Sequence, residues 1–295
     1  MPIPFIPVHS LAPSAPVRVL RHPLTRLILL PLALLPVAAV NLGVSILVLD
    51  RLPAPLAKHQ IVFQSVVIVA LLALIYQRFC KGAERRQVLE FSWNGALKEF
   101  LVGAAIAAGW VSTFVLLLTA SGSYRISGVS SAATLMDATF LFAMGSFAQE
   151  LFFSLIVLRL LEEWLGSRLA LGLSVAVFVA AHVLNPNQSV LSFLGLAAVG
   201  TTFMAAFMWT RRLWLAWGLH FAWNLLQAGV FGMPNSGHSF KGLLRPVISG
   251  PTWLTGGAFG FEASILTILF LTVLTVLFMQ RASLHGQLLA PRWKR

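Results

Sequence analysis

A chain of 295 residues with 58% hydrophobic and only 10% charged residues is too apolar for a soluble domain, in which about a quarter of the residues carry charge. The mean hydropathy of +0.85 indicates an all-α polytopic membrane protein. The formal charge of +12 does not indicate a nucleic-acid partner, because the Lys and Arg residues lie at the ends of apolar segments. The single cysteine, Cys80, excludes an internal disulfide and a CxxC-type metal or redox motif.

Apolar segments follow one another along the chain and predict a bundle of about eight transmembrane helices. Most are long enough to cross a bilayer at about 1.5 Å per residue, although the fifth is short. Helices are expected because they satisfy their own backbone polar groups in lipid. The first segment is longer than the apolar part of a signal peptide and is interpreted as a retained span. The segments cover residues 27–49, 60–77, 99–120, 135–161, 169–184, 190–209, 213–231 and 262–280.

The distribution of basic residues predicts the orientation of the bundle. With the N-terminus placed in the cytoplasm, sixteen of the 21 Lys and Arg residues fall on the cytoplasmic side. The other five are Arg51, Lys58, Arg125, Lys241 and Arg245. Because cytoplasmic loops carry an excess of Lys and Arg, this asymmetry predicts a multi-pass protein of a cell (inner) membrane with both termini in the cytoplasm.

Three parts of the chain are distinguished by this pattern. Residues 1–134 are expected to hold the first three transmembrane helices, residues 135–280 the helical core with the candidate catalytic residues described below, and residues 281–295 a basic cytoplasmic tail. The longest stretch between spans, residues 232–261, is rich in Gly, Pro and Ser and is expected to be a non-cytoplasmic loop that folds back over the bundle. No internal repeat is present, which argues against a transporter.

Polar side chains lie deep inside three of the predicted helices. Glu150, with Gln149 beside it, His182 and Asn224 each lie about 12 to 14 residues from the predicted cytoplasmic end of their helix, or roughly 20 Å. His220 precedes Asn224 by four residues and shares its helix face. Because ionisable groups at membrane depth are costly, these residues indicate a shared functional site. Either His taken alone is equally consistent with a hydrogen-bonded packing residue.

Two kinds of chemistry are open to such a site. A buried Glu150 can act as a general base on water, while His182, His220 and Asn224 donate hydrogen bonds to an oxyanion. This arrangement predicts peptide-bond hydrolysis without a covalent intermediate or a cofactor. The alternative is a zinc site with Glu150, His182 and His220 as ligands. A serine nucleophile is not indicated, because no GxSxG motif is present.

At these residues the chain resembles the CPBP family of intramembrane proteases, which includes the type II CAAX prenyl endopeptidases and bacteriocin-processing or self-immunity proteins. The family carries EExxxR, FxxxH and HxxxN on successive helices. The second motif is intact from Phe178 to His182 and the third from His220 to Asn224. The segment LLEEWLGSRLA, residues 160–170, looks like the family's connector, and residues 256–262 match a GGxxGxE element of bacterial members. The resemblance covers about 135–270 and implies an endopeptidase acting on a membrane-associated protein or peptide.

The first motif departs from the family pattern, because Gln149 and Ser154 replace its first Glu and its Arg. The resemblance implies that the first Glu of the motif activates the water, and an amide at that position cannot act as a base. Two hypotheses follow. In one, Glu150 supplies the base; in the other, the chain is a degenerate member that acts as a membrane binding, immunity or chaperone protein.

Overall fold

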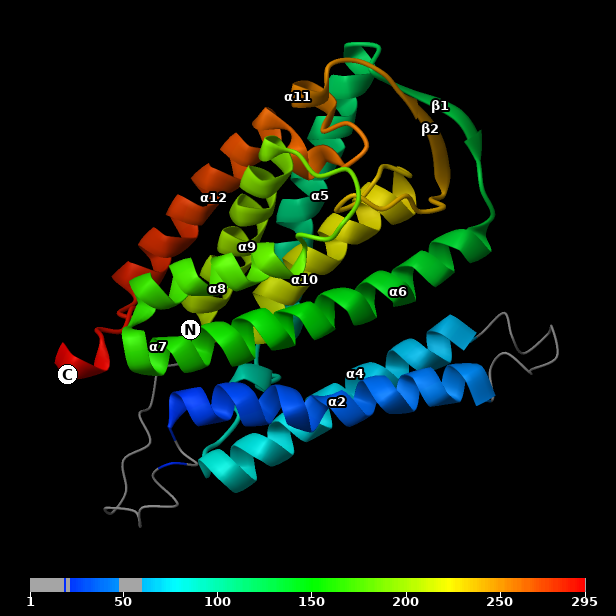
Figure 1. Cartoon of the computed structure of the whole chain (residues 1–295). Coiled ribbons are helices and arrows are strands. Elements are labelled where there is room, and N and C mark those ends of the chain that lie inside the picture. The colour runs from blue at the N-terminus through cyan, green and yellow to red at the C-terminus, as the bar shows by residue number, and fades with distance from the viewer. Residues whose placement is uncertain (1–18, 20–21, 48–59, 295) are drawn as a thin grey trace.

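The computed structural model describes residue 19, residues 22–47 and residues 60–294, and it places helices at all eight predicted positions (Figure 1). Their ends differ from the predicted ends by only a few residues. The fold class is therefore all-α, as the hydropathy pattern predicted. The segments are α2 (Pro23–Leu47), α4 (Gln60–Phe79), α5 (Ala96–Ala120), α6 (Ala132–Glu150) with its continuation, α8 (Ser167–Ala181), α9 (Val190–Thr210), α10 (Leu213–Asn224) and α12 (Ile265–Leu284).

The fourth segment is one long helix that runs through the middle of the molecule (Figure 1). It begins as α6, where the side chain of Ser131 accepts from the backbone N–H of Thr134, and it ends as α7 (Arg159–Leu165). Between them lies η4 (Leu151–Leu158), a π-helical stretch. Such widened turns occur mostly as local insertions in α-helices and often at functional sites. Here the π-helix begins directly after Glu150.

Shorter elements lie between the long helices. The seventh predicted segment begins as α10 and continues as the π-helix η5 (Leu225–Val230). Two strands, β1 (Tyr124–Val129) and β2 (Leu244–Ile248), pair antiparallel, with Tyr124 opposite Ile248 and a bulge between Ile126 and Gly128. The remaining short helices are η2 (Cys80–Glu84), η3 (Leu89–Phe91), α11 (Thr252–Thr255), η6 (Phe261–Ala263) and η7 (Arg292–Lys294).

Helices α5 and α10 approach each other closely because glycine lies at their contact. A Cβ atom on Gly103 of α5 would lie 2.3 Å from the carbonyl oxygen of Leu215. A Cβ atom on Gly218 of α10 would lie 2.1 Å from the carbonyl oxygen of Phe100. Small residues permit such contacts between helices in membranes, where packing rather than the hydrophobic effect drives association. This contact positions α10, which carries His220 and Asn224.

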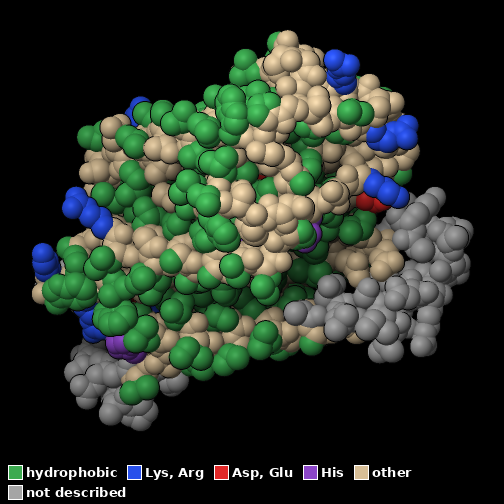
Figure 2. Space-filling model, turned by 45° about the horizontal axis from the view of Figure 1, so that its top comes forward, with side chains coloured by type: hydrophobic (Ala, Val, Ile, Leu, Met, Phe, Trp, Pro, Cys, Tyr) green, Lys and Arg blue, Asp and Glu red, His purple; other side chains and the backbone are tan. Residues whose placement is uncertain are grey.

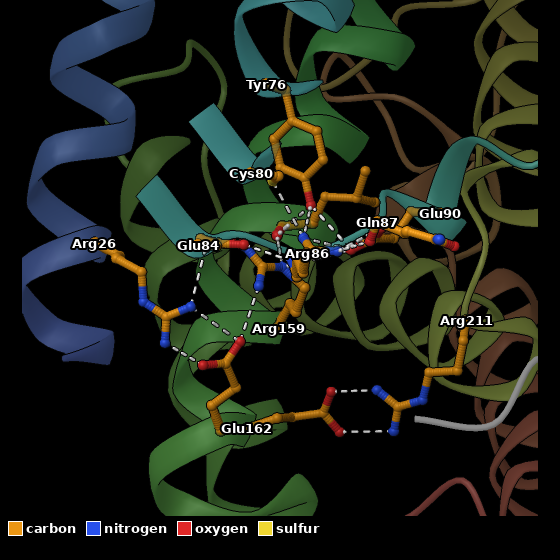
Figure 3. Close-up of polar contacts among 12 residues, drawn as sticks. Arg26, Tyr76, Cys80, Glu84, Arg86, Gln87, Glu90, Arg159, Glu162 and Arg211 are labelled. Carbon is orange, nitrogen blue, oxygen red and sulfur yellow. Dashed lines mark hydrogen bonds and ion pairs between the residues drawn. The ribbon is translucent and has the colours of Figure 1, made fainter. Parts of the chain in front are cut away.

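A buried cluster of charged side chains ties α2 and α4 to the central helix (Figure 3). Arg159 donates to Glu84 and to Glu163, at 2.9 Å each, and to the carbonyl oxygen of Leu155. Arg26 of α2 donates to the same two carboxylates. The other members are Arg86, Glu90 and Tyr76. Buried charges are tolerated because each has a partner of opposite sign.

The end of the chain packs against the core. Beyond α12, the backbone carbonyl of Leu289 accepts from the N–H of Ser167 at 3.0 Å, and the carbonyl of Gln287 accepts from Arg211. Arg211 also pairs with Glu162 of α7 at 2.5 Å. The described part of the predicted basic tail is thus attached to the turn between α7 and α8.

The outer surface of the bundle is apolar. Figure 2 shows a broad hydrophobic face with Lys and Arg at its margins. Among the described residues, five helices are long and apolar enough to cross a membrane, whereas residues 23–37 and 167–181 form shorter apolar helices. The five cover residues 60–84, 96–120, 132–165, 190–210 and 265–284. The chain is therefore a polytopic integral membrane protein.

The start of α2 and the end of the chain lie at the same end of the bundle as α7 (Figure 1). The side of the membrane that this end faces stays a prediction. Part of the charge pattern that supports it, namely Arg18, Arg21, Arg51, Lys58 and Arg295, lies outside the described residues.

Candidate active site

Glu150 lies at the last α-helical position of α6, where the helix widens into η4. Its side chain is 2% exposed. One carboxylate oxygen, Oε2, accepts a hydrogen bond from the Ser154 hydroxyl at 2.7 Å. Ser154 therefore holds the buried carboxylate from the next turn of the same helix. The residue that replaces the family's Arg is a hydrogen-bond donor to the site.

His220 of α10 is the second partner of this carboxylate. Its Nδ1 atom lies 2.8 Å from Oε1 of Glu150, and its ring stacks on Phe203 of α9 at 4.3 Å between centroids. Because an ionised carboxylate only accepts hydrogen bonds, Nδ1 carries the proton in this pair. The Nε2 atom of the neutral ring then presents a lone pair. It has no hydrogen-bond partner among the described residues.

His182 occupies the turn directly after α8 and is half-buried. Its Nδ1 atom donates to the carbonyl oxygen of Phe178 at 2.7 Å, and the centroids of the Phe178 and His182 rings lie 4.5 Å apart. The spacing of the second motif thus serves to orient the imidazole. The ring of Phe153, next to Ser154, lies 6.4 Å from the His182 ring. His182 therefore lies beside the π-helix without bonding Glu150 directly, and within electrostatic range of His220.

Asn224 lies one turn beyond His220, at the end of α10. Its Oδ1 atom accepts from Nδ2 of Asn235 at 2.9 Å. Its own Nδ2 group donates no hydrogen bond to any described residue. Asn224 is therefore the one member of the four predicted site residues that offers free N–H groups when both imidazoles are neutral.

Gln149 lies next to Glu150 in sequence but outside this network. Its side chain is half-buried and forms no hydrogen bond within the described part of the chain. Neighbouring positions on a helix point about 100° apart, so Gln149 and Glu150 face different surroundings. The structure thus brings Glu150, Ser154 and His220 into contact, with His182 and Asn224 beside them.

The described residues form no group of three or more His, Cys, Asp or Glu side chains arranged to hold a metal ion. Nδ1 of His220 is engaged by Glu150 and Nδ1 of His182 by a backbone carbonyl. Nε2 is then the ring atom that each imidazole presents, and metal-binding histidines often have this arrangement. The zinc site of Glu150, His182 and His220 and the site without a metal both stay predictions.

The loop over the bundle brings residues to the end of α10 that were not among the four predicted site residues. Asn235 donates to Asn224 at the end of α10, and Glu262 accepts from Gln227 of η5 and from the backbone N–H of Ser236. Folding back of residues 232–261 was predicted, and the GGxxGxE element placed Glu262 in a motif. The partners of these residues were not readable, because they depend on how the loop returns to the helix ends.

Comparison with known proteins assigns part of this chain to a family. Residues 131–226, which include the positions of all three motifs, match the family described as Rce1-like: Type II CAAX prenyl endopeptidase Rce1-like. This segment covers about a third of the chain. No match was found among curated proteins or among solved structures. The resemblance seen in the motifs is confirmed by this match: residues 131–226 of this chain are similar to the Rce1-like type II CAAX prenyl endopeptidase family.

Proposed function

We propose that this protein is an intramembrane peptide hydrolase of CAAX-protease type that cleaves a membrane-associated protein or peptide. The observation that carries the proposal is the buried pair of Glu150 and His220, 2.8 Å apart, within the segment that matches the family. A carboxylate that orients an imidazole makes that imidazole an effective general base. Glu150 therefore acts on the water through His220.

The reaction follows from the hydrogen-bond roles of these groups. Nε2 of His220 takes a proton from a water molecule while Glu150 stabilises the imidazolium. The water oxygen bonds to the scissile carbonyl carbon, and the carbonyl oxygen becomes an oxyanion that accepts from Nδ2 of Asn224. The C–N bond then breaks as the imidazolium returns its proton to the leaving nitrogen. His182, whose Nδ1 proton is held by Phe178, adds a second donor only when protonated.

An apolar cavity between helices that carry the site fits a substrate held in the membrane. The cavity measures about 530 Å³ and lies between α2, η4 and α8. Its lining is aliphatic and aromatic, and includes Leu27, Phe152, Val177 and Ala180. Phe152 follows Glu150 by two residues and Ala180 precedes His182 by two. None of the four site residues lines the cavity, so an apolar chain there would pack on the helices that carry the site rather than on the catalytic groups.

Purified protein in detergent, given prenylated and unprenylated peptides, tests the proposal. We expect cleavage by the wild-type protein and a loss of about 10²- to 10⁴-fold in kcat for Glu150→Gln, which removes the charge that supports the imidazolium. Gln149→Ala is the matched control and keeps wild-type kcat, because Gln149 has no bond in the site. Cleavage that survives Glu150→Gln but is lost in Gln149→Ala would overturn the assignment.

A second candidate function is membrane binding without cleavage. Two observations favour it: an amide occupies the family's base position, and Ser154 takes the place of the family's Arg. In that case the wild-type protein is inactive, and the double substitution Gln149→Glu with Ser154→Arg restores cleavage of the same peptides. Cleavage by the unmodified protein excludes this function.

A further inference from the structure

A chain of buried and partly buried hydrogen bonds connects the returning loop to Asn224. Asn235, 8% exposed, donates from Nδ2 to Oδ1 of Asn224 at 2.9 Å and to Oε1 of Gln227 at 3.3 Å. Gln227 is fully buried and donates from Nε2 to Glu262 at 2.6 Å and to the carbonyl oxygen of Pro234 at 2.5 Å. The bonds from Gln227 to Glu262 and from Asn235 to Gln227 are buried, and those to Pro234 and Asn224 are partly buried.

The orientation of each amide in this chain is determined by its neighbour. The carbonyl oxygen of Pro234 can only accept, so the nitrogen of Gln227 must face it and Oε1 must face Asn235. Because Oε1 of Gln227 is an acceptor, the Nδ2 group of Asn235 must point toward Gln227 and Asn224. Asn224 consequently presents Oδ1 to Asn235, and its Nδ2 group is turned away from the loop.

We propose that Asn235 is a positioning residue of the reaction: by holding Oδ1 of Asn224, it directs the Nδ2 group of Asn224 to the oxyanion. This inference rests on the proposed function. Without Asn235, the Asn224 amide can rotate by 180° about its terminal bond and present an oxygen to the developing negative charge. An oxygen there repels the oxyanion, whereas an N–H group stabilises it.

The loop is built to keep this network in place. Glu262, 2% exposed, also accepts from the backbone N–H of Ser236 at 3.0 Å, next to Asn235. Gly260 adopts φ of +120°, and a Cβ atom there would lie 2.4 Å from Oε2 of Glu262 and 2.8 Å from Nε2 of Gln227. Gly260, the third glycine of the GGxxGxE element, thus leaves room for the hydrogen bonds of Glu262, the glutamate of the same element.

Steady-state cleavage of the peptide that the wild-type protein cuts tests the inference. Asn235→Ala is expected to lower kcat roughly 10- to 100-fold with KM unchanged, because the lost interaction acts only on the transition state. Asn235→Asp keeps the shape but replaces the donor with an acceptor, so it is expected to lose at least as much. In an Asn224→Ala background, Asn235→Ala should have no further effect, because the two residues act as one unit.

Asn185→Ala provides the matched control. Asn185 ties the same loop by a bond of 2.8 Å to the carbonyl oxygen of Ser236 and does not touch Asn224, so kcat should stay at the wild-type value. An equal loss in this control, full activity in Asn235→Asp, or losses that multiply in the double variant would overturn the positioning role. A folded wild-type protein that cleaves no peptide would overturn the proposed function itself, and the positioning role with it.

Discussion

Both oxygens of the Glu150 carboxylate are occupied, Oε1 by His220 and Oε2 by Ser154. The hydrogen bond to Ser154 fixes the carboxylate, and the one to His220 orients the imidazole. Ser154 has a neutral hydroxyl where the family motif has an Arg. Its hydrogen bond to Glu150 can therefore be removed by substitution without changing the charge of the site.

Removing the Ser154 hydroxyl should weaken the fold around Glu150. We expect Ser154→Ala to lower the free energy of unfolding by about 1–3 kcal/mol, because a buried carboxylate loses a donor. Denaturant titration in detergent measures this change. Ser174 is the control: its hydroxyl is buried without a partner among the described residues, so Ser174→Ala should be neutral or stabilising. A larger loss for Ser174→Ala than for Ser154→Ala would contradict the expected difference.

Burial raises the pKa of Glu262 to about 7, although hydrogen bonds from Gln227 and Ser236 act to lower it. The folded protein therefore binds this proton more tightly than the unfolded chain does. Stability from this group is fully present below about pH 4.5 and is lost as the pH rises through about 7. Thermal unfolding in detergent at a series of pH values should show this decline. Glu262→Gln should flatten it, and an unchanged slope in that variant would count against the assignment.

At the scale of single elements, α5 carries one glycine at a helix contact and one in open space. Gly103→Ala places a Cβ atom 2.3 Å from a carbonyl oxygen of α10, so α10 must shift. We expect a loss of about 1–3 kcal/mol in the free energy of unfolding together with a lower kcat, because α10 carries His220. Gly109 has no atom within 4 Å of its built Cβ, and Gly109→Ala should be neutral or stabilising. Equal effects of the two substitutions would contradict this account of the contact.

At the scale of the whole molecule, the buried charge cluster attaches α2 and α4 to the core. Arg159→Ala leaves Glu84 buried with fewer partners and is expected to cost about 3–5 kcal/mol, measured as the free energy of unfolding in detergent. Arg168→Ala, at an exposed position on α8, should have little effect. Local loss of protection from hydrogen exchange in α2 and α4, with α9 and α12 unchanged, would identify the cluster as their attachment. Uniform loss in all helices would argue against it.

The positions of the helices and the identity of the site motifs were predictable from the sequence. Lipid leaves a backbone no alternative to internal hydrogen bonds, so a long apolar segment is a helix wherever it lies in the fold. Depth along a helix follows from a constant rise per residue, so Glu150, His182 and Asn224 were expected near one level. Both predictions depend on local geometry alone.

Which of the residues at this depth contact one another was decided by the tertiary structure. Arg26 and Arg159, which the charge pattern placed in cytoplasmic pieces of the chain, are buried ion-pair partners, because helix packing brings carboxylates from distant segments to them. Asn235 reaches Asn224 because a loop returns to the end of α10. Sequence periodicity determines which residues share a helix face, but the rotation of one helix against another determines which of them meet. The pairing of Glu150 with His220 rather than with His182 is therefore a property of the folded bundle.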